Sequence, residues 1–93
     1  MPFVAVTTVN LEGRDRAGAE KLLGEVLIPR LKAQPGFRSA RFLASLDGKT
    51  GVGAATFDTE ANAKAGLDAM RTDRPAEAPP VVGTTIYEVV AEV

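Results

Sequence analysis

The chain lacks cysteine and histidine entirely. Without cysteine there can be no disulfide bond, no thiolate zinc site, no iron–sulfur cluster and no cysteine nucleophile. Without histidine the chain loses the commonest general base, the proximal ligand of haem and the donor used by most transition-metal sites. We therefore expect neither a metal nor a cofactor, and no serine-histidine-aspartate triad.

The sequence also lacks a strong charge of either sign. Its 11 basic and 12 acidic residues give a net charge of −1, which offers no electrostatic footprint for nucleic acid or for an anionic lipid surface. Apolar residues make up 45% of the chain and charged residues 25%, as in an ordinary soluble globular domain. The 93 residues suffice for one domain, which we expect to span residues 1–93.

No long apolar run is present. The chain starts with MPFVAV, which contains neither a basic leader nor an apolar segment long enough for a signal peptide or a membrane span. We therefore expect a cytoplasmic protein with no membrane partner.

The hydrophobic pattern predicts the element order βαββαβ. Residues 3–9, 37–46, 52–57 and 81–93 have the composition of strands, whereas residues 15–34 have the 3.6-residue apolar period of a helix. Pro29 is expected to kink or divide that helix, and a second helix follows Asp58-Thr59. Residues 47–51, which include Gly48 and Gly51, are assigned to a hairpin loop that joins two strands, and Gly53 falls in the returning strand. Residues 72–80, which include three prolines, are assigned to a surface loop.

This order predicts a ferredoxin-like α+β sandwich, in which two helices cover one face of an antiparallel sheet. The first and last strands nevertheless have apolar residues on both faces. A monomer would therefore leave an apolar patch in water. A second copy of the same sheet is the simplest cover for it, so we expect a homodimer through the sheet face.

Two segments of the chain resemble a known family. Residues 33–43 read AQPGFRSARFL, and after the predicted hairpin residues 55–61 read ATFDTEA. A helix that ends in Pro-Gly-Phe, and an aromatic residue that closes the third strand just before a capped helix, resemble the antibiotic-biosynthesis-monooxygenase-like family of dimeric α+β barrels. The resemblance implies a homodimer whose sheets face each other, with a small hydrophobic cavity in each subunit.

Members of that family include cofactor-independent oxygenases of aromatic polyketides and haem-degrading enzymes. The haem-degrading branch has an asparagine on the first strand, a tryptophan at the end of the third and a histidine on the second helix. Here Thr7 and Phe57 stand at the first two places, and the chain has no histidine. The resemblance therefore implies that haem is neither bound nor degraded.

The sequence leaves open whether the protein is an enzyme. One hypothesis is a dimeric module that binds a small apolar or aromatic ligand in a cavity between the sheet and the helices, without catalysis. The alternative is a cofactor-independent monooxygenase-like enzyme that acts on an aromatic or polyketide-like substrate. For either function, the candidate ligand-binding residues are Thr7, Arg41, Phe57, Tyr87 and Glu88.

The sequence also leaves open which face of the sheet lines the cavity. If the helices cover the apolar face of the second strand, which includes Phe42, then Arg41 looks into the dimer as the cavity cation. Thr7 and Phe57 are expected to point the same way as Arg41. Glu88 would join them if Tyr87 packs under the helices.

Overall fold

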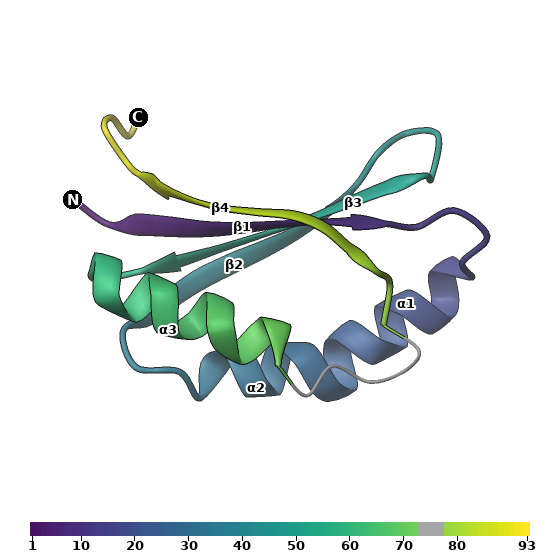
Figure 1. The fold of residues 1–93 in the computed structure, drawn as a ribbon, viewed down its shortest axis with the longest axis horizontal. Helices are drawn as coiled ribbons and strands as arrows, with labels where there is room; N and C mark the ends of the chain where they lie inside the picture. Colours follow the sequence, from purple (N-terminus) through teal and green to yellow (C-terminus); the bar gives the residue numbers. More distant parts are fainter. Residues whose placement is uncertain (73–77) are drawn as a thin grey trace.

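The computed structural model describes residues 1–72 and 78–93. The elements along the chain are β1 (Phe3–Asn10), α1 (Arg16–Leu22), the π-helix η1 (Leu23–Leu27), α2 (Ile28–Lys32), β2 (Phe37–Ala44), β3 (Thr50–Phe57), α3 (Glu60–Arg71) and β4 (Val81–Glu88). Figure 1 shows the helices together beneath one twisted sheet.

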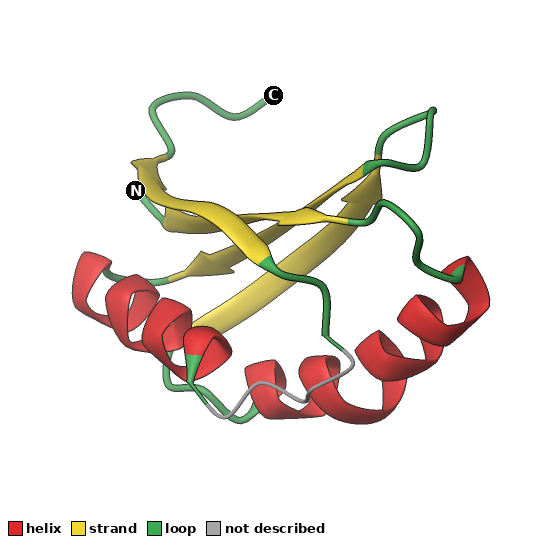
Figure 2. Cartoon of the chain, turned by 45° about the vertical axis from the view of Figure 1, so that its right-hand side comes forward, coloured by secondary structure: helices red, strands yellow, loops and turns green. Residues whose placement is uncertain are grey.

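The four strands form one antiparallel sheet in the order β2-β3-β1-β4. In the part of the chain that the structure describes, the helices lie on one face of this sheet and none lies over the opposite face (Figure 2). This arrangement is the ferredoxin-like α+β fold, and it confirms the fold class expected from the element order.

The first helical segment is divided, as expected from Pro29. Asp15 caps its start through a carboxylate oxygen that accepts from the Gly18 N–H at 3.1 Å. In η1 the N–H of Ile28 donates to the carbonyl of Leu23 five residues back, which is the π-helical pattern. Pro29, which has no N–H to donate to the preceding turn, then follows at the start of α2.

Boundaries differ from the expectation at the last strand and around the hairpin, where β2 ends at Ala44 and not at residue 46. The last strand was expected to reach residue 93 but ends at Glu88, and the Val89 N–H then donates to the carbonyl of Pro2 at 2.9 Å. Of the two glycines assigned to the hairpin loop, only Gly48 lies in the turn, at φ 75°. Gly51 is part of β3, so the assignment of this residue to the loop was wrong, whereas Gly53 lies in β3 as expected.

The core lies between the sheet and the helices. Its buried members are Ala5, Leu31, Ala55, Phe57, Ala63 and Leu67. The Phe57 ring packs edge-on against Phe37, with ring centroids 5.9 Å apart. On the other side a Cβ added at Gly66 would overlap the Phe57 ring, so glycine at this position lets α3 approach the sheet closely.

The segment assigned to a surface loop, residues 72–80, falls partly outside the described residues, which omit 73–77. Within the described part, Ala78 and Pro79 are buried. The expectation of a surface loop was therefore wrong for these two residues. The carbonyl of Pro80 accepts from the Asn10 N–H at 3.0 Å and ties the segment to the end of β1. In the described segments, no helix combines the length and the apolar character needed to span a bilayer.

Candidate functional site

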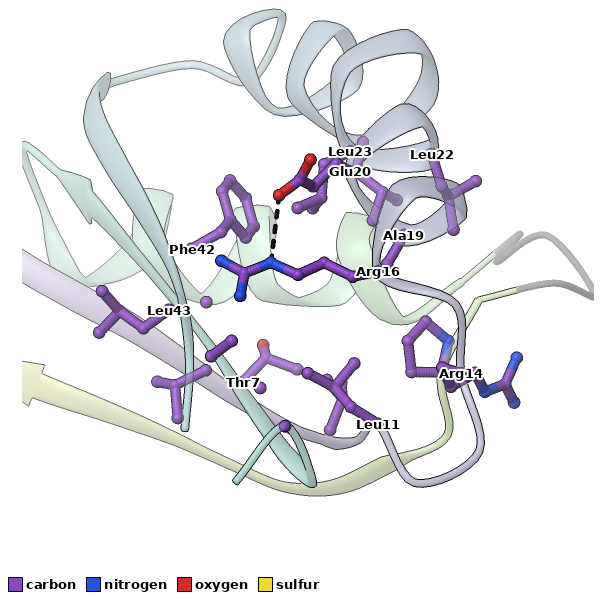
Figure 3. Close-up of a pocket in the computed structure, with 18 of the residues that line it drawn as sticks. Thr7, Leu11, Arg14, Arg16, Ala19, Glu20, Leu22, Leu23, Phe42 and Leu43 are labelled. Atoms are coloured by element: carbon purple, nitrogen blue, oxygen red, sulfur yellow. Dashed lines mark hydrogen bonds and ion pairs between the residues drawn. The ribbon is translucent and has the colours of Figure 1, made fainter. Parts of the chain in front are cut away.

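A cavity of about 290 Å³ lies between α1–η1 and the end of the sheet that bears the β2–β3 hairpin. Figure 3 shows Leu22 and Leu23 on the helical side and Phe42 on β2. The cavity walls are mostly apolar, with Leu11, Leu22, Leu23, Leu27, Phe42 and Met70 among the lining residues. A concave apolar space of this kind is typical of sites for small organic molecules.

The floor of the cavity is open because β3 presents glycine there. Gly51 and Gly53 both line the cavity. A Cβ at Gly51 would come within 2.9 Å of Val9 Cγ2, and a Cβ at Gly53 within 3.1 Å of Phe42 Cε1. Side chains at these positions would crowd the neighbouring strands and project toward the helices. The two glycines therefore keep the space between β3 and η1 free.

Polar side chains are few in the cavity. Thr7 projects from β1 into it, and its hydroxyl makes no hydrogen bond to the described part of the chain. At the rim, Arg16 Nε donates to Glu20 Oε1 at 3.3 Å, with side-chain exposures of 81% and 66% (Figure 3). The hydroxyl of Thr7 is thus available to a bound molecule inside, whereas the charges of α1 are solvated at the entrance.

The candidate residues named from the sequence do not come together. Thr7 lines the cavity. Phe57 is 0% exposed in the core beneath α3, and Arg41 is exposed on the face without helices. Tyr87 is on that same open face, 56% exposed. Glu88 is exposed at the end of β4, opposite Phe3.

The expectation that Thr7 and Phe57 share a face with Arg41 was therefore wrong. The reason is strand register: Gly53 of β3 is the partner of both Thr7 and Phe42. Directly paired residues point to the same side of a sheet, so Thr7 lies on the helix-covered side with Phe42. Phe57, four residues along β3 from Gly53, points to that side too. Tyr87 does not pack under the helices, and Glu88 does not join Arg41.

Sequence analysis missed the residues that make most of the cavity wall. Ala19, Leu22 and Leu23 were treated only as helix positions, Gly51 as a loop residue and Gly53 only as part of the returning strand. A usable signal was present, because a hairpin centred on Asp47-Gly48 pairs residues whose numbers add up to 95. That count alone places Phe42 opposite Gly53.

Comparison with known proteins identifies the fold. No protein-family model matches the chain, and no curated protein matches it. Among solved structures, Rv0793 from Mycobacterium tuberculosis superposes with a TM-score of 0.66 at 18% identity, over 99% of this chain and 98% of that one. A monooxygenase from the gene ActVA-Orf6 of Streptomyces coelicolor, solved with the ligand Nanaomycin D, superposes with a TM-score of 0.65 at 23% identity, over 98% and 89%.

A third similar structure is the haem degrader MhuD (Rv3592) from Mycobacterium tuberculosis, solved with two haems in its active site. It has a TM-score of 0.63 and 18% identity, over 98% of both chains. Two further similar structures, from Chloroflexus aurantiacus and Nitrosomonas europaea, carry the name antibiotic biosynthesis monooxygenase. The chain therefore has the fold of this group, and the resemblance noted in its sequence is confirmed at that level.

The residues of this chain do not fit haem. The sequence offers no histidine or cysteine as an axial ligand. Phe57, at the place where a tryptophan was expected in haem degraders, lies in the core and does not line the cavity. In the described segments, no three histidine, cysteine or acidic side chains cluster to hold a metal ion. A haem titration is therefore expected to give no sharp Soret shift, and a tight one-to-one complex would contradict this.

Proposed function

We propose that the protein binds a small, flat and largely apolar ligand in the cavity between the sheet and α1–η1. The observation that carries this proposal is the apolar space of about 290 Å³ with the Thr7 hydroxyl inside it. Burial of an apolar ring against aromatic and aliphatic walls is favourable, and the Thr7 hydroxyl can form a hydrogen bond with one polar atom of that ring. In this proposal Thr7 remains a candidate ligand-binding residue. Arg41, Tyr87 and Glu88 do not line this cavity.

We further propose that two copies of the chain pair through the open face of the sheet. Val4 pairs with Tyr87 and Val6 with Ala54, so these side chains share that face. Tyr87 is 56% and Leu43 55% exposed, although both are large and apolar in body. An apolar face of this kind is what a two-fold partner covers in a homodimer.

Binding without catalysis is the function that the cavity chemistry favours. Inside the cavity, the described lining offers a threonine hydroxyl, and the charged side chains among its lining residues are exposed ones that belong to the segment from Arg14 to Glu20. General acid–base catalysis needs a titratable group within hydrogen-bond reach of the reacting atom. Arg16 and Glu20 are already engaged with each other at the rim.

A cofactor-independent monooxygenase is the second candidate. It is favoured by the structural likeness to the Streptomyces coelicolor monooxygenase solved with Nanaomycin D. Such chemistry would depend on an electron-rich ring of the substrate itself, and the cavity would supply position and exclusion of water. Protein-dependent uptake of dioxygen in the presence of a hydroxylated naphthalene would support it, and uptake equal to the protein-free rate would argue against it.

Blocking the cavity is expected to abolish ligand binding. Ala19 lies on α1 and lines the cavity (Figure 3), so Ala19→Phe places a ring in the space. With Nanaomycin D as the probe, calorimetric titration should show a rise in Kd of at least about tenfold, which corresponds to about 1.4 kcal/mol. The matched control is Ala17→Phe, because Ala17 is exposed on the same helix and does not line the cavity.

The control variant should bind like the unmodified protein. If Ala19→Phe binds Nanaomycin D as tightly as Ala17→Phe does, the ligand sits elsewhere and the proposed site is wrong. If the unmodified protein binds neither Nanaomycin D nor a hydroxylated naphthalene, the ligand class is wrong. Far-UV circular dichroism of each variant separates these outcomes from loss of the fold.

A further inference from the structure

A second, much smaller cavity lies beside the first and deeper in the core. Its volume is about 30 Å³. Four residues line both spaces, namely Thr7, Phe42, Gly53 and Met70, and the other walls come from Ala5, Leu31, Ala55, Gly66 and Leu67. We call this space the inner compartment.

The inner compartment exists because the elements around it present small residues. Ala5 of β1 and Ala55 of β3 face it from the sheet, and Gly66 faces it from α3. The bulkier Phe57 ring, against which Gly66 lies, holds the helix at a fixed distance from the sheet. The walls that the compartment does not share with the first cavity are therefore formed by buried residues of the core.

The walls of the inner compartment favour an apolar molecule over water. Among the described residues that line the compartment, Thr7 alone has a polar side chain. A water molecule needs two to four polar partners to be stable in a cavity, whereas apolar cavities stay dry and take up apolar guests such as xenon. About 30 Å³ accommodates a body of roughly two heavy atoms, since about 10 to 15 Å³ of such volume is enough for one water.

We infer that the inner compartment is a binding site for a small apolar molecule of the size of dioxygen. A ring bound in the larger cavity would contact Phe42 and Gly53, which also border the compartment. Dioxygen held there would thus lie next to the ring, and Thr7 borders both spaces. We infer only that dioxygen binds reversibly in the compartment. The presence of a ring beside it rests on the proposed function.

Dioxygen itself is the probe for this site. It is paramagnetic and accelerates the relaxation of the protons that it touches. The methyl groups of Ala5 and Ala55 line the compartment, whereas the equally buried methyl of Ala63 lines neither cavity. Under oxygen pressure, methyl relaxation measured by NMR should rise several-fold more at Ala5 and Ala55 than at Ala63. Equal rises at all three alanines would overturn the inference.

A pair of variants on adjacent residues tests the location. Ala55→Val adds two methyl groups into the compartment and should remove the excess relaxation at Ala5. Ala54→Val makes the same change on the opposite face of β3, where Ala54 pairs with Val6, and should leave it unchanged. Persistence of the excess in a folded Ala55→Val protein would also overturn the inference. The experiment uses no aromatic ligand, so failure of Nanaomycin D to bind and failure of dioxygen to bind are separate results.

Discussion

Replacement of Phe57 by alanine is expected to lower the free energy of unfolding by about 3 to 5 kcal/mol, the usual cost of truncating a buried phenylalanine. The Phe57 side chain is 0% exposed and meets Phe37 edge-on. It also fills the space above Gly66, so its loss leaves a cavity that α3 cannot close without moving. Urea denaturation at one fixed protein concentration measures the change, because dimerisation would couple stability to concentration.

Phe42→Ala is the matched control for this prediction. Phe42 is also a strand phenylalanine on the helix-covered side, but it is half-buried and one side of its ring faces the cavity. Truncation there enlarges an existing space and removes fewer contacts, so its cost should be clearly smaller. Equal losses for the two variants would show that Phe57 is not the centre of the core.

The elements of this fold could be predicted from the sequence because their signals are local. Asp15 and Thr59 each cap a helix with a side-chain oxygen, which accepts from the backbone N–H of Gly18 or Asn62. Pro29 marks the division of the first helical segment because a proline cannot donate to the preceding turn. Signals of this kind act within a few residues.

The end of the last strand could not be predicted in the same way. Residues 89–93 read VVAEV, which has strand composition, but β4 ends at Glu88 opposite Phe3, where β1 begins. A strand continues only where a neighbour offers both donors and acceptors. Beyond Phe3 the Pro2 carbonyl still accepts from the Val89 N–H, but Pro2 has no N–H to donate in return. The composition of residues 89–93 does not indicate where the pairing of this strand with its neighbour ends.

The candidate site was only partly predictable, because the face of a residue depends on register between strands. A shift by one residue moves every side chain to the other side of the sheet. Thr7 lines the cavity on the helix-covered side, whereas the sequence analysis grouped it with Arg41, which lies on the opposite face. The cavity itself depends on how far α1–η1 lies from β3, and this distance is set by packing between distant segments.

Replacement of Val6 by lysine is expected to dissociate the proposed homodimer. Val6 lies in the middle of β1 on the open face, paired with Ala54 and Thr85. In a two-fold dimer the substitution occurs twice and places a charge without a partner in an apolar interface, at a cost of several kcal/mol. The dissociation constant should rise by at least about 100-fold, since each 1.4 kcal/mol is a factor of ten. Sedimentation at micromolar concentration should change from twice the chain mass of 9.7 kDa to a single chain.

Leu46→Lys separates this effect from a general effect of added charge. Leu46 is a fully exposed apolar residue at the tip of the β2–β3 hairpin, away from the strands that form the open face. The tip is held by Asp47, whose carboxylate accepts from Ser45 and from the Lys49 N–H, so the substitution should not disturb the strands. Leu46→Lys should sediment as a dimer and Val6→Lys as a monomer with unchanged circular dichroism. A monomeric unmodified protein, or a dimeric Val6→Lys protein, would show that the open face is not the dimer interface.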